Sequence, residues 1–416
     1  MSKPQAASDG AKWRQLALLA LVQFLAMTLW FSASAVTRAL QSEWSLSGGA
    51  VAWLTISVQL GFVIGALASS ILNLSDRFPQ PRLMAIGALV GAATNLAIPL
   101  GVPESLGRTP AGFALVIALR MLTGVMLAAV YPTGMKLMAT WFARGRGLAI
   151  GILVGALTLG SASPHLLNAF ASGGSDWRMV MTISSACATT AGVLALLFIQ
   201  TGPNLPSAAR FDWSYFARVW ADPALRRANF GYLGHMFELY AMWAWAPQLL
   251  AESFQRGKLS SSSASLAGFA TVAIGGLGCV LAGAWADRIG RTWTTIVSLV
   301  ISGSCALVAG HLVGQPYWLL AVCLLWGFSV VADSAQFSAA ISELCDPRYV
   351  GTALTIQTCA GFLLTTLTIR AVPAVREHFD WPLAMSLLAL GPLFGIWHMA
   401  RLRTLPAALK MAGGQR

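Results

Sequence analysis

The stretch that decides the fold is the charged turn Gly283-Ala-Trp-Ala-Asp-Arg-Ile-Gly-Arg291. Apolar runs flank this turn on both sides, at approximately 264–284 and 292–313. A transmembrane helix needs about 20 mostly apolar residues to cross the bilayer hydrocarbon, and each run is long enough to do so. The turn therefore predicts a loop at a membrane surface that joins two transmembrane helices.

The first half of the chain contains a related turn, Leu74-Ser-Asp-Arg-Phe-Pro-Gln-Pro-Arg82, which also lies between two apolar runs. Its Asp-Arg pair precedes the pair at 287–288 by 211 residues, and the first and seventh apolar runs have the same offset. A second echo joins Arg144-x-x-Gly147 to Arg348-x-x-Gly351, 204 residues further on. Repeats of this length predict two related halves.

Reading outward from these turns, we predict an all-α integral membrane protein with twelve transmembrane helices in two six-helix halves. The predicted spans are approximately 15–38, 50–73, 82–101, 111–135, 146–170 and 178–200, then 226–250, 264–284, 292–313, 316–339, 350–371 and 381–400. The predicted organisation is a cytoplasmic tail at 1–14, an N-terminal half at 15–200, a central cytoplasmic loop at 201–225, a C-terminal half at 226–400 and a cytoplasmic tail at 401–416.

The composition of the chain agrees with this class of protein. Of its 416 residues, 56% are hydrophobic and only 10% are charged, against about 25% charged residues in soluble proteins. A disordered chain or a disulfide-stapled secreted scaffold is therefore excluded. The net charge of +12 comes from basic residues in short loops, mostly on one side, so both termini are predicted to face the cytoplasm and we expect no nucleic-acid partner.

With these motifs, the sequence resembles the major facilitator superfamily over about residues 12 to 403. The signature is intact at 283–291, whereas Pro79-Gln80-Pro81 replaces its Gly-Arg ending in the first copy. The resemblance implies a multi-pass secondary transporter of the bacterial plasma (inner) membrane that works by alternating access, is not an enzyme and acts as a monomer. It also implies a cytoplasmic gate formed by Asp76, Arg77, Asp287, Arg288 and Arg291; plain positive-inside charge is the alternative reading of these residues.

A further match lies in the fourth predicted span, where Arg120-x-x-x-Gly124 is similar to an Arg motif of this superfamily. The stretch from Trp141 to Gly151 is similar to one found in branches that carry organic or inorganic anions. An arginine inside the membrane must meet a carboxylate, a group of carbonyls, an anionic substrate or water. Arg120 is therefore predicted either to contact the substrate or take part in coupling, or to anchor the helix.

Acidic residues occur near the middle of two other predicted spans. Charge is costly inside lipid, so such residues are candidates for function. Glu238 lies three residues after His235 and shares a helical face with it, and Asp333 shares a face with Gln336. We predict that these residues take part in substrate binding or proton coupling, although a polar pair that only fixes the packing is an alternative.

Three aromatic residues complete the predicted substrate site, namely Trp30, Tyr131 and Tyr240, which could line a central cavity. The six cysteines show no metal-ligand spacing, and we expect neither a metal nor a cofactor. The chain also lacks a nucleotide-binding loop, so uphill transport must draw on an ion gradient or on exchange.

The preferred hypothesis is a transporter of a small organic or inorganic anion that is coupled to protons. A proton-coupled exporter of drugs or metabolites is the first alternative, and a carrier of neutral solutes such as sugars is the second. A membrane sensor that does not transport is a further alternative. Such sensors usually carry a cytoplasmic output domain, and the two predicted tails are short. Besides the solute and protons, we expect contacts with membrane lipid.

Overall fold

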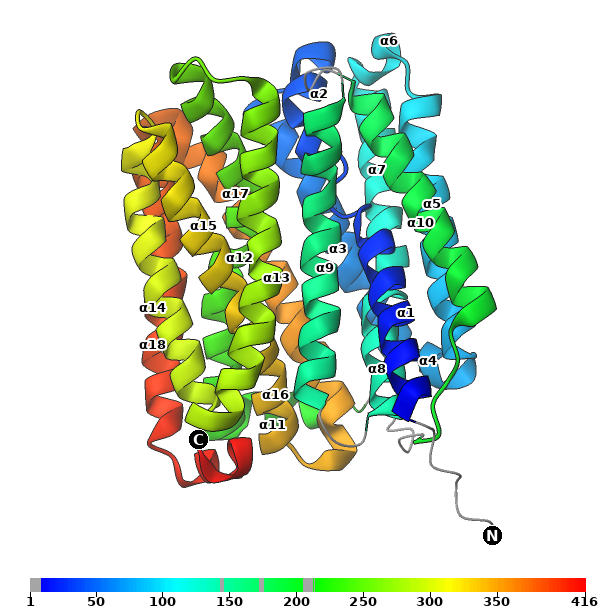
Figure 1. The fold of residues 1–416 in the computed structure, drawn as a ribbon, viewed down its shortest axis with the longest axis vertical. Helices are drawn as coiled ribbons and strands as arrows, with labels where there is room; N and C mark the ends of the chain where they lie inside the picture. Colours follow the sequence, from blue (N-terminus) through cyan, green and yellow to red (C-terminus); the bar gives the residue numbers. More distant parts are fainter. Residues whose placement is uncertain (1–8, 143–145, 172–175, 205–211, 213) are drawn as a thin grey trace.

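The computed structural model describes residues 9–142, 146–171, 176–204, 212 and 214–416, and all regular structure in these residues is helical (Figure 1). The elements of the first half are α1 (Asp9–Met27), η1 (Ser34–Val36), α2 (Thr37–Trp44), α3 (Gly48–Ile71), α4 (Leu74–Arg77), α5 (Gln80–Gly101), α6 (Glu104–Gly107), α7 (Pro110–Leu127), α8 (Tyr131–Trp141), α9 (Arg146–Phe170) and α10 (Trp177–Phe198).

The second half repeats this pattern of long helices with short ones at their ends. Its elements are α11 (Ser214–Ala221), α12 (Pro223–Arg256), α13 (Ser261–Ile289), α14 (Arg291–Ala309), η2 (Gly310–Leu312), α15 (Pro316–Ala332), α16 (Ser334–Leu344), η3 (Pro347–Tyr349), α17 (Val350–Ser386), η4 (Leu387–Ala389), α18 (Leu390–Arg403) and η5 (Pro406–Gly414).

Among the described residues, nine segments are long and apolar enough to cross a membrane, so the chain is a multi-pass membrane protein. The helices α1 and α12 are not among the nine. One of the nine, Pro347–Arg403, has 57 residues, and at 1.5 Å per residue its length of about 85 Å is too great for one crossing. Its backbone leaves the helical conformation at Asp380, where φ is 59°. The number of twelve spans and the cytoplasmic position of both termini remain predictions.

Three of the predicted spans are interrupted by turn residues within their length, so the expectation of one continuous helix for each span is corrected there. The span predicted at 15–38 ends as an α-helix at Met27, and a turn at 28–33 precedes η1. The span at 111–135 is interrupted at 128–130, between α7 and α8. The span at 316–339 is interrupted at Asp333, between α15 and α16. Each interruption lies deep inside the bundle, and each contains or adjoins a predicted site residue, namely Trp30, Tyr131 or Asp333.

The two halves meet along two pairs of helices, α9 with α13 and α3 with α17. Figure 1 shows α9 and α13 side by side over most of their length. Glycines permit this approach, because a Cβ atom on Gly155 would lie 3.3 Å from the carbonyl oxygen of Gly276. Such close packing of two backbones favours helix association in a membrane.

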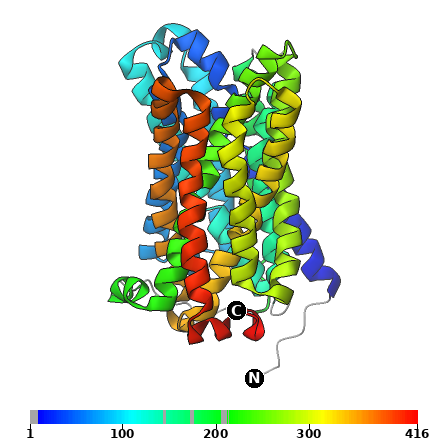
Figure 2. The same cartoon turned by 90° about the vertical axis from the view of Figure 1, so that its left-hand side faces the viewer.

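The start of α1 and the C-terminus lie at the same end of the bundle, which we call the tail end (Figures 1 and 2). The helices α2 and α6 lie at the opposite end, which we call the loop end. At the loop end Gln248 Nε2 donates to Thr37 Oγ1 across the two halves at 3.1 Å. At the tail end the hydroxyls of Ser70 and Thr355 lie 2.8 Å apart. The halves are thus in contact at both ends.

Candidate functional site

Arg120 lies on α7 and is fully buried, facing the turn at 28–33 that interrupts the first predicted span. Two of its hydrogen bonds go to main-chain carbonyls of that turn: Nη1 donates to Leu29 O at 2.9 Å, and Nη2 donates to Trp30 O at 2.6 Å. Nε donates to Leu54 O on α3 at 3.2 Å. Carbonyls of a broken helix lack their usual partners, so the guanidinium stabilises the break.

Two side chains complete the coordination of Arg120. Nη1 also donates to Ser32 Oγ at 3.0 Å and to Asn95 Oδ1 at 3.1 Å. Asn95 is held in place because its Nδ2 donates to Met181 O and to Ser185 Oγ on α10. All three guanidinium nitrogens therefore donate to oxygen atoms of the chain, and the N-terminal half buries its arginine among neutral acceptors.

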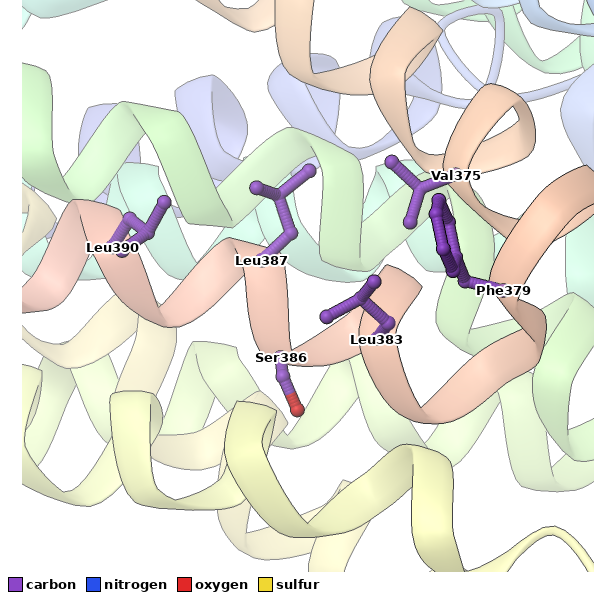
Figure 3. Close-up of a pocket in the computed structure, with 6 residues that line it drawn as sticks. All are labelled: Val375, Phe379, Leu383, Ser386, Leu387 and Leu390. Carbon is purple, nitrogen blue, oxygen red and sulfur yellow. The ribbon is translucent and has the colours of Figure 1, made fainter.

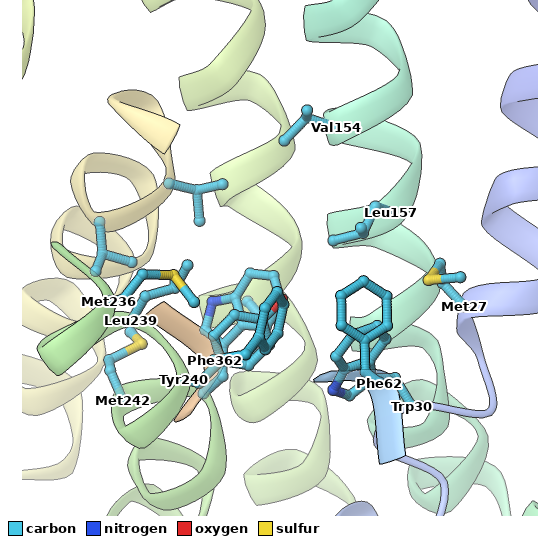
Figure 4. Packing of buried hydrophobic residues seen from close by; sticks show 14 of the residues in the cluster. Met27, Trp30, Phe62, Val154, Leu157, Met236, Leu239, Tyr240, Met242 and Phe362 are labelled. Atoms are coloured by element: carbon cyan, nitrogen blue, oxygen red, sulfur yellow. The ribbon is translucent and has the colours of Figure 1, made fainter. Parts of the chain in front are cut away.

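Six aromatic side chains, which we call the aromatic cluster, fill the centre between the halves, where Figure 4 shows rings from both halves facing one another. Trp30 packs against Phe62 with ring centroids 5.0 Å apart, and against Tyr240 and Phe362 at 5.9 and 5.5 Å. The cluster consists of Trp30, Phe31, Phe62, Tyr240, Trp243 and Phe362. Two of its members, Trp30 and Phe31, lie on the turn that Arg120 holds.

Glu238 is fully buried on α12, and both of its carboxyl oxygens accept hydrogen bonds from neighbouring helices. Ser302 Oγ on α14 donates to Oε2 at 2.8 Å, and Trp326 Nε1 on α15 donates to Oε1 at 2.7 Å. Glu238 is thus bonded to two neighbouring helices, although it shares a helical face with His235. Both donors are uncharged.

His235 pairs instead with Asp333, at the interruption between α15 and α16. Asp333 Oδ1 lies 2.9 Å from His235 Nδ1, and both side chains are buried. His235 Nε2 lies 2.9 Å from Ser334 Oγ, the first residue of α16. This contact is an ion pair when the imidazole is protonated, so its strength depends on where the protons are.

Two of the three predicted gate residues of the second half, Asp287 and Arg291, belong to a cluster at the tail end. Arg291 Nη1 lies 3.1 Å from Asp287 Oδ1 and donates to Gln336 Oε1 at 2.9 Å. Its Nη2 donates to Glu343 Oε1 at 3.0 Å. Gln336, predicted to accompany Asp333 in substrate binding or coupling, is thus brought to the gate cluster, while Arg288 is exposed.

A segment near the C-terminus packs onto this cluster. Ala412 N donates to Glu343 Oε2 at 3.0 Å, and both the N–H and the hydroxyl of Thr292 donate to Arg416 O. Met411 is fully buried there. In the sequence this segment is a predicted tail, and no pattern in it indicates that it packs against the gate.

Of the predicted gate residues of the first half, the structure describes the side chain of Arg77 alone. Arg77 ends the four-residue helix α4 and is exposed. The side chain of Asp76 and the residue Arg144 lie outside what the structure describes. Nearby, Lys136 Nζ on α8 donates to Ser75 Oγ at 3.0 Å.

The remaining predicted aromatic residue, Tyr131, is partly buried in the first turn of α8. Sequence reasoning missed Asn95, Ser302 and Trp326, which partner the buried charges. Hydroxyl, amide and indole groups are common in such spans, so their types alone carried no signal. The described residues contain no group of three or more His, Cys, Asp or Glu side chains able to hold a metal ion.

A cavity of about 290 Å³ lies on the outer side of α17, η4 and α18, with the side chains shown in Figure 3. Five of its six lining residues are apolar, and Ser386 contributes the sixth. Phe379 and Leu390 in its wall are more than half exposed. The cavity therefore belongs to the outer surface of the bundle and is separate from the buried charges.

Comparison with known proteins shows the class of the molecule. The chain matches the Major Facilitator Superfamily over residues 19–367 and 228–412, and it therefore belongs to this superfamily of transporters. Among solved structures, a crystal structure of a mutant of the nucleoside transporter NupG is similar in fold, with a TM-score of 0.70. It is 13% identical in sequence, and the match covers 93% of this chain and 99% of that one. Comparison with curated protein sequences finds no match.

Proposed function

We propose that this protein is a secondary transporter that moves a small solute together with protons by alternating access. The observation that carries the proposal is Glu238, a buried carboxyl group whose partners are Ser302 and Trp326. A hydroxyl can donate to a carboxylate and accept from a carboxylic acid. Ser302 can therefore serve Glu238 with or without its proton, which a proton carrier requires.

The second proton-binding pair of the proposal is His235 with Asp333. Asp333 lies at the break between α15 and α16, next to the helix start that Ser334 forms. Proton movement between the imidazole and the carboxyl would change the charge at this break and its contact with α12. A change of this kind can bias a rocking movement between the two halves.

The contacts between halves define what must change during transport. Opening the loop end separates Gln248 from Thr37, and opening the tail end separates Ser70 from Thr355. Both contacts are single hydrogen bonds between neutral groups, worth about 0.5–1.5 kcal/mol each. Contacts of this size can break and re-form in a transport cycle. In keeping with the family, the proposed setting is the bacterial inner membrane and the proposed unit is a monomer.

An anionic substrate remains a prediction. It rests on Arg120 and on the Trp141–Gly151 stretch, and the structure describes only part of that stretch. The three nitrogens of Arg120 already donate to carbonyl, hydroxyl and amide oxygens. An anion would have to replace these partners. The geometry therefore supports the proton-coupled class more strongly than it supports this choice of solute.

The test is proton movement driven by solute in vesicles. The purified protein is reconstituted with an internal pH dye, and uridine, glucose, benzoate and tetraphenylphosphonium gradients are applied in turn. We expect one class of solute to move protons with the wild type and at least about tenfold less with Glu238→Gln. The exposed Glu377 provides the matched Glu377→Gln control, which should transport normally. Solute uptake that moves no protons would contradict the proposal.

A further inference from the structure

Three glutamines in the interior lack partners inside the chain. Gln23 on α1, Gln59 on α3 and Gln357 on α17 are at most 1% exposed, and neither amide atom of any of them forms a hydrogen bond. The indole N–H groups of Trp30 and Trp243 are also unpartnered. An unpaired buried polar group costs about 1–3 kcal/mol, and native proteins pair most such groups.

These glutamines lie close to aromatic side chains of both halves. Gln59 is one helical turn from Phe62 on α3, so both point to the same side of the helix. Gln357 is one turn from Gly361, whose backbone lies against the Tyr232 ring. The amide oxygen of Gln23 faces Gly134, one turn along α8 from Tyr131.

The unpartnered set comes from both halves. Gln23, Gln59 and Trp30 belong to the first half, and Gln357 and Trp243 belong to the second half. Alternating access requires a solute to contact both halves in turn, and it places the site between them. A site built from these groups would meet that requirement. The aromatic cluster would lie between the groups of the first half and those of the second half.

The chemistry of the set is neutral. Each amide offers an acceptor and two donors, and each indole offers one donor. Of the buried ionisable groups nearby, Arg120 is bonded to the turn at 28–33 and Glu238 to Ser302 and Trp326. The carboxyl group of Asp333 lies 2.9 Å from His235 Nδ1, without hydrogen-bond geometry. An ion placed among neutral amides and rings would lose its hydration without gaining a counter-charge, which is strongly unfavourable.

We propose that the transported solute is uncharged and carries a flat ring with hydrogen-bonding groups at its edges. This inference rests on the proposed function, because it names the substrate class of the same transporter. The ring of the solute would replace ring contacts such as that between Trp30 and Tyr240, whose centroids are 5.9 Å apart. Its edges would pair with the glutamine amides. Aromatic walls with a few placed polar groups are typical of small-molecule sites.

Thermal unfolding of the full-length protein in detergent tests the inference. The probes are uridine (flat and uncharged), glucose (uncharged without a flat ring), benzoate (a flat anion) and tetraphenylphosphonium (a cation). Binding to the folded state raises the apparent melting temperature when the probe exceeds its Kd. We expect the largest shift with uridine. A panel in which uridine produces no shift, or in which only benzoate or tetraphenylphosphonium produces one, overturns the inference.

Substitution of the glutamines gives a second test with an unusual signature. Gln59→Leu and Gln357→Leu remove unpaired amides, so the ligand-free protein should melt at an unchanged or higher temperature, while uridine binding should weaken at least tenfold. Gln15 on α1 is the matched control, because its Nε2 donates to Phe198 O and its Oε1 accepts from Gln200 N. Gln15→Leu should lower stability and leave uridine binding unchanged. Full uridine binding in both site variants contradicts the inference.

The two proposals fail separately. If uridine binds and crosses the membrane without proton movement, the proton coupling is wrong and the solute class stands. If benzoate or tetraphenylphosphonium drives proton movement and uridine does not bind, the solute class is wrong and the coupling stands.

Discussion

The two halves bury charge in opposite ways. In the first half the cation Arg120 fills a break in the helix that begins with α1, and its partners include the carbonyls of Leu29 and Trp30. In the second half the corresponding helix, α12, runs without a break from Pro223 to Arg256 and carries the acid Glu238. The partners of Glu238 are side chains rather than backbone.

This difference indicates that the buried charges of the two halves have different roles. A guanidinium keeps its charge at all ordinary pH values, so the contacts of Arg120 are permanent. In the proposed mechanism carboxyl groups gain and lose protons, so the contacts of Glu238 and of Asp333 with its neighbour His235 would change during a cycle. The contacts of Arg120 in the first half thus hold a fixed shape, which positions Trp30 and Phe31, whereas Glu238, His235 and Asp333 of the second half are groups that can respond to protons.

The largest effect should follow from Arg120→Met, which keeps a long apolar side chain and removes the charge. Five acceptors would lose a buried donor, at about 1–3 kcal/mol for each one left unpaired. We expect a folded yield or melting temperature far below that of Glu238→Gln, measured on both variants in the same detergent. Arg120→Met with wild-type stability would show that the fixed shape of the first half does not depend on this residue.

A matched pair of serines sharpens the comparison. Ser32 accepts from Arg120, and Ser302 donates to Glu238. Each Ser→Ala change removes one partner of a buried charge, so each should cost about 1–3 kcal/mol in unfolding free energy. Only Ser302→Ala should also change the pH dependence of transport, because only Ser302 contacts a group that titrates. A changed pH profile in Ser32→Ala, with none in Ser302→Ala, would reverse the assignment.

Much of the fold follows from composition, but the breaks in the helices do not. Apolar runs of about 20 residues locate most of the long helices, and the Asp-Arg repeat locates the halves. The sequence at 28–33 has neither Pro nor Gly, so nothing local indicates that the helix ends at Met27. The break depends on Arg120, about 90 residues away on another helix. By contrast, Pro132 is a local signal for the break before α8.

The charged residues of the candidate site could be predicted, because burying charge is costly, but their partners could not. That cost singles out Arg120, Glu238 and Asp333, and the structure buries all three. It does not say which groups pair. Glu238 and His235 share a helical face, yet they contact different helices, since α14 and α15 supply the donors to Glu238 and α16 begins next to His235. Such pairings depend on tertiary packing.

A smaller effect concerns Gly290, in the second copy of the Asp-Arg turn. In the second copy Gly290 has φ 94° and ψ 157°, a conformation that is essentially restricted to glycine. A Cβ atom there would also lie 2.4 Å from Arg416 O, so Gly290 permits the contact with the C-terminal segment. We expect Gly290→Ala to cost about 1–3 kcal/mol in unfolding free energy. At Gly314, where no atom lies within 4 Å of a Cβ, Gly314→Ala should change little, and equal costs at both sites would refute this account.

The smallest effect concerns the loop end, where the halves are alike. In the first half Glu43 accepts from Trp177 Nε1 at 2.6 Å and from Arg178 Nη2 at 2.8 Å. In the second half Glu252 accepts from Trp381 Nε1 at 2.8 Å and from Arg376 Nη2 at 2.6 Å. The guanidinium lies 4.3 Å from the tryptophan ring in both. Trp177 and Trp381 are 204 residues apart, the offset of the Arg-Gly echo.

We call the contacts of Glu43 with Trp177 and Arg178, and the matching contacts of Glu252, the loop-end clamps. The clamp at Glu43 can be tested by varying the pH. Partial burial by itself raises the pKa of Glu43, but the hydrogen bonds from Arg178 and Trp177 and the charges of Arg178 and Arg108 outweigh it, so the pKa lies below its ordinary value of 4.5. The clamp therefore stabilises the folded state fully above pH 4.5 and loses its contribution as the pH falls through the lowered pKa. Glu43→Gln should cost no more than about 1 kcal/mol at pH 7, since the pair is partly exposed, and the difference from the wild type should shrink below pH 4.5. Thermal unfolding of both proteins between pH 3.5 and 7 measures this. If the difference in stability instead grows as the pH falls, Glu43 is protonated more readily in the folded state than in the unfolded state. The contacts that the two loop-end clamps share would then not be explained by electrostatic attraction.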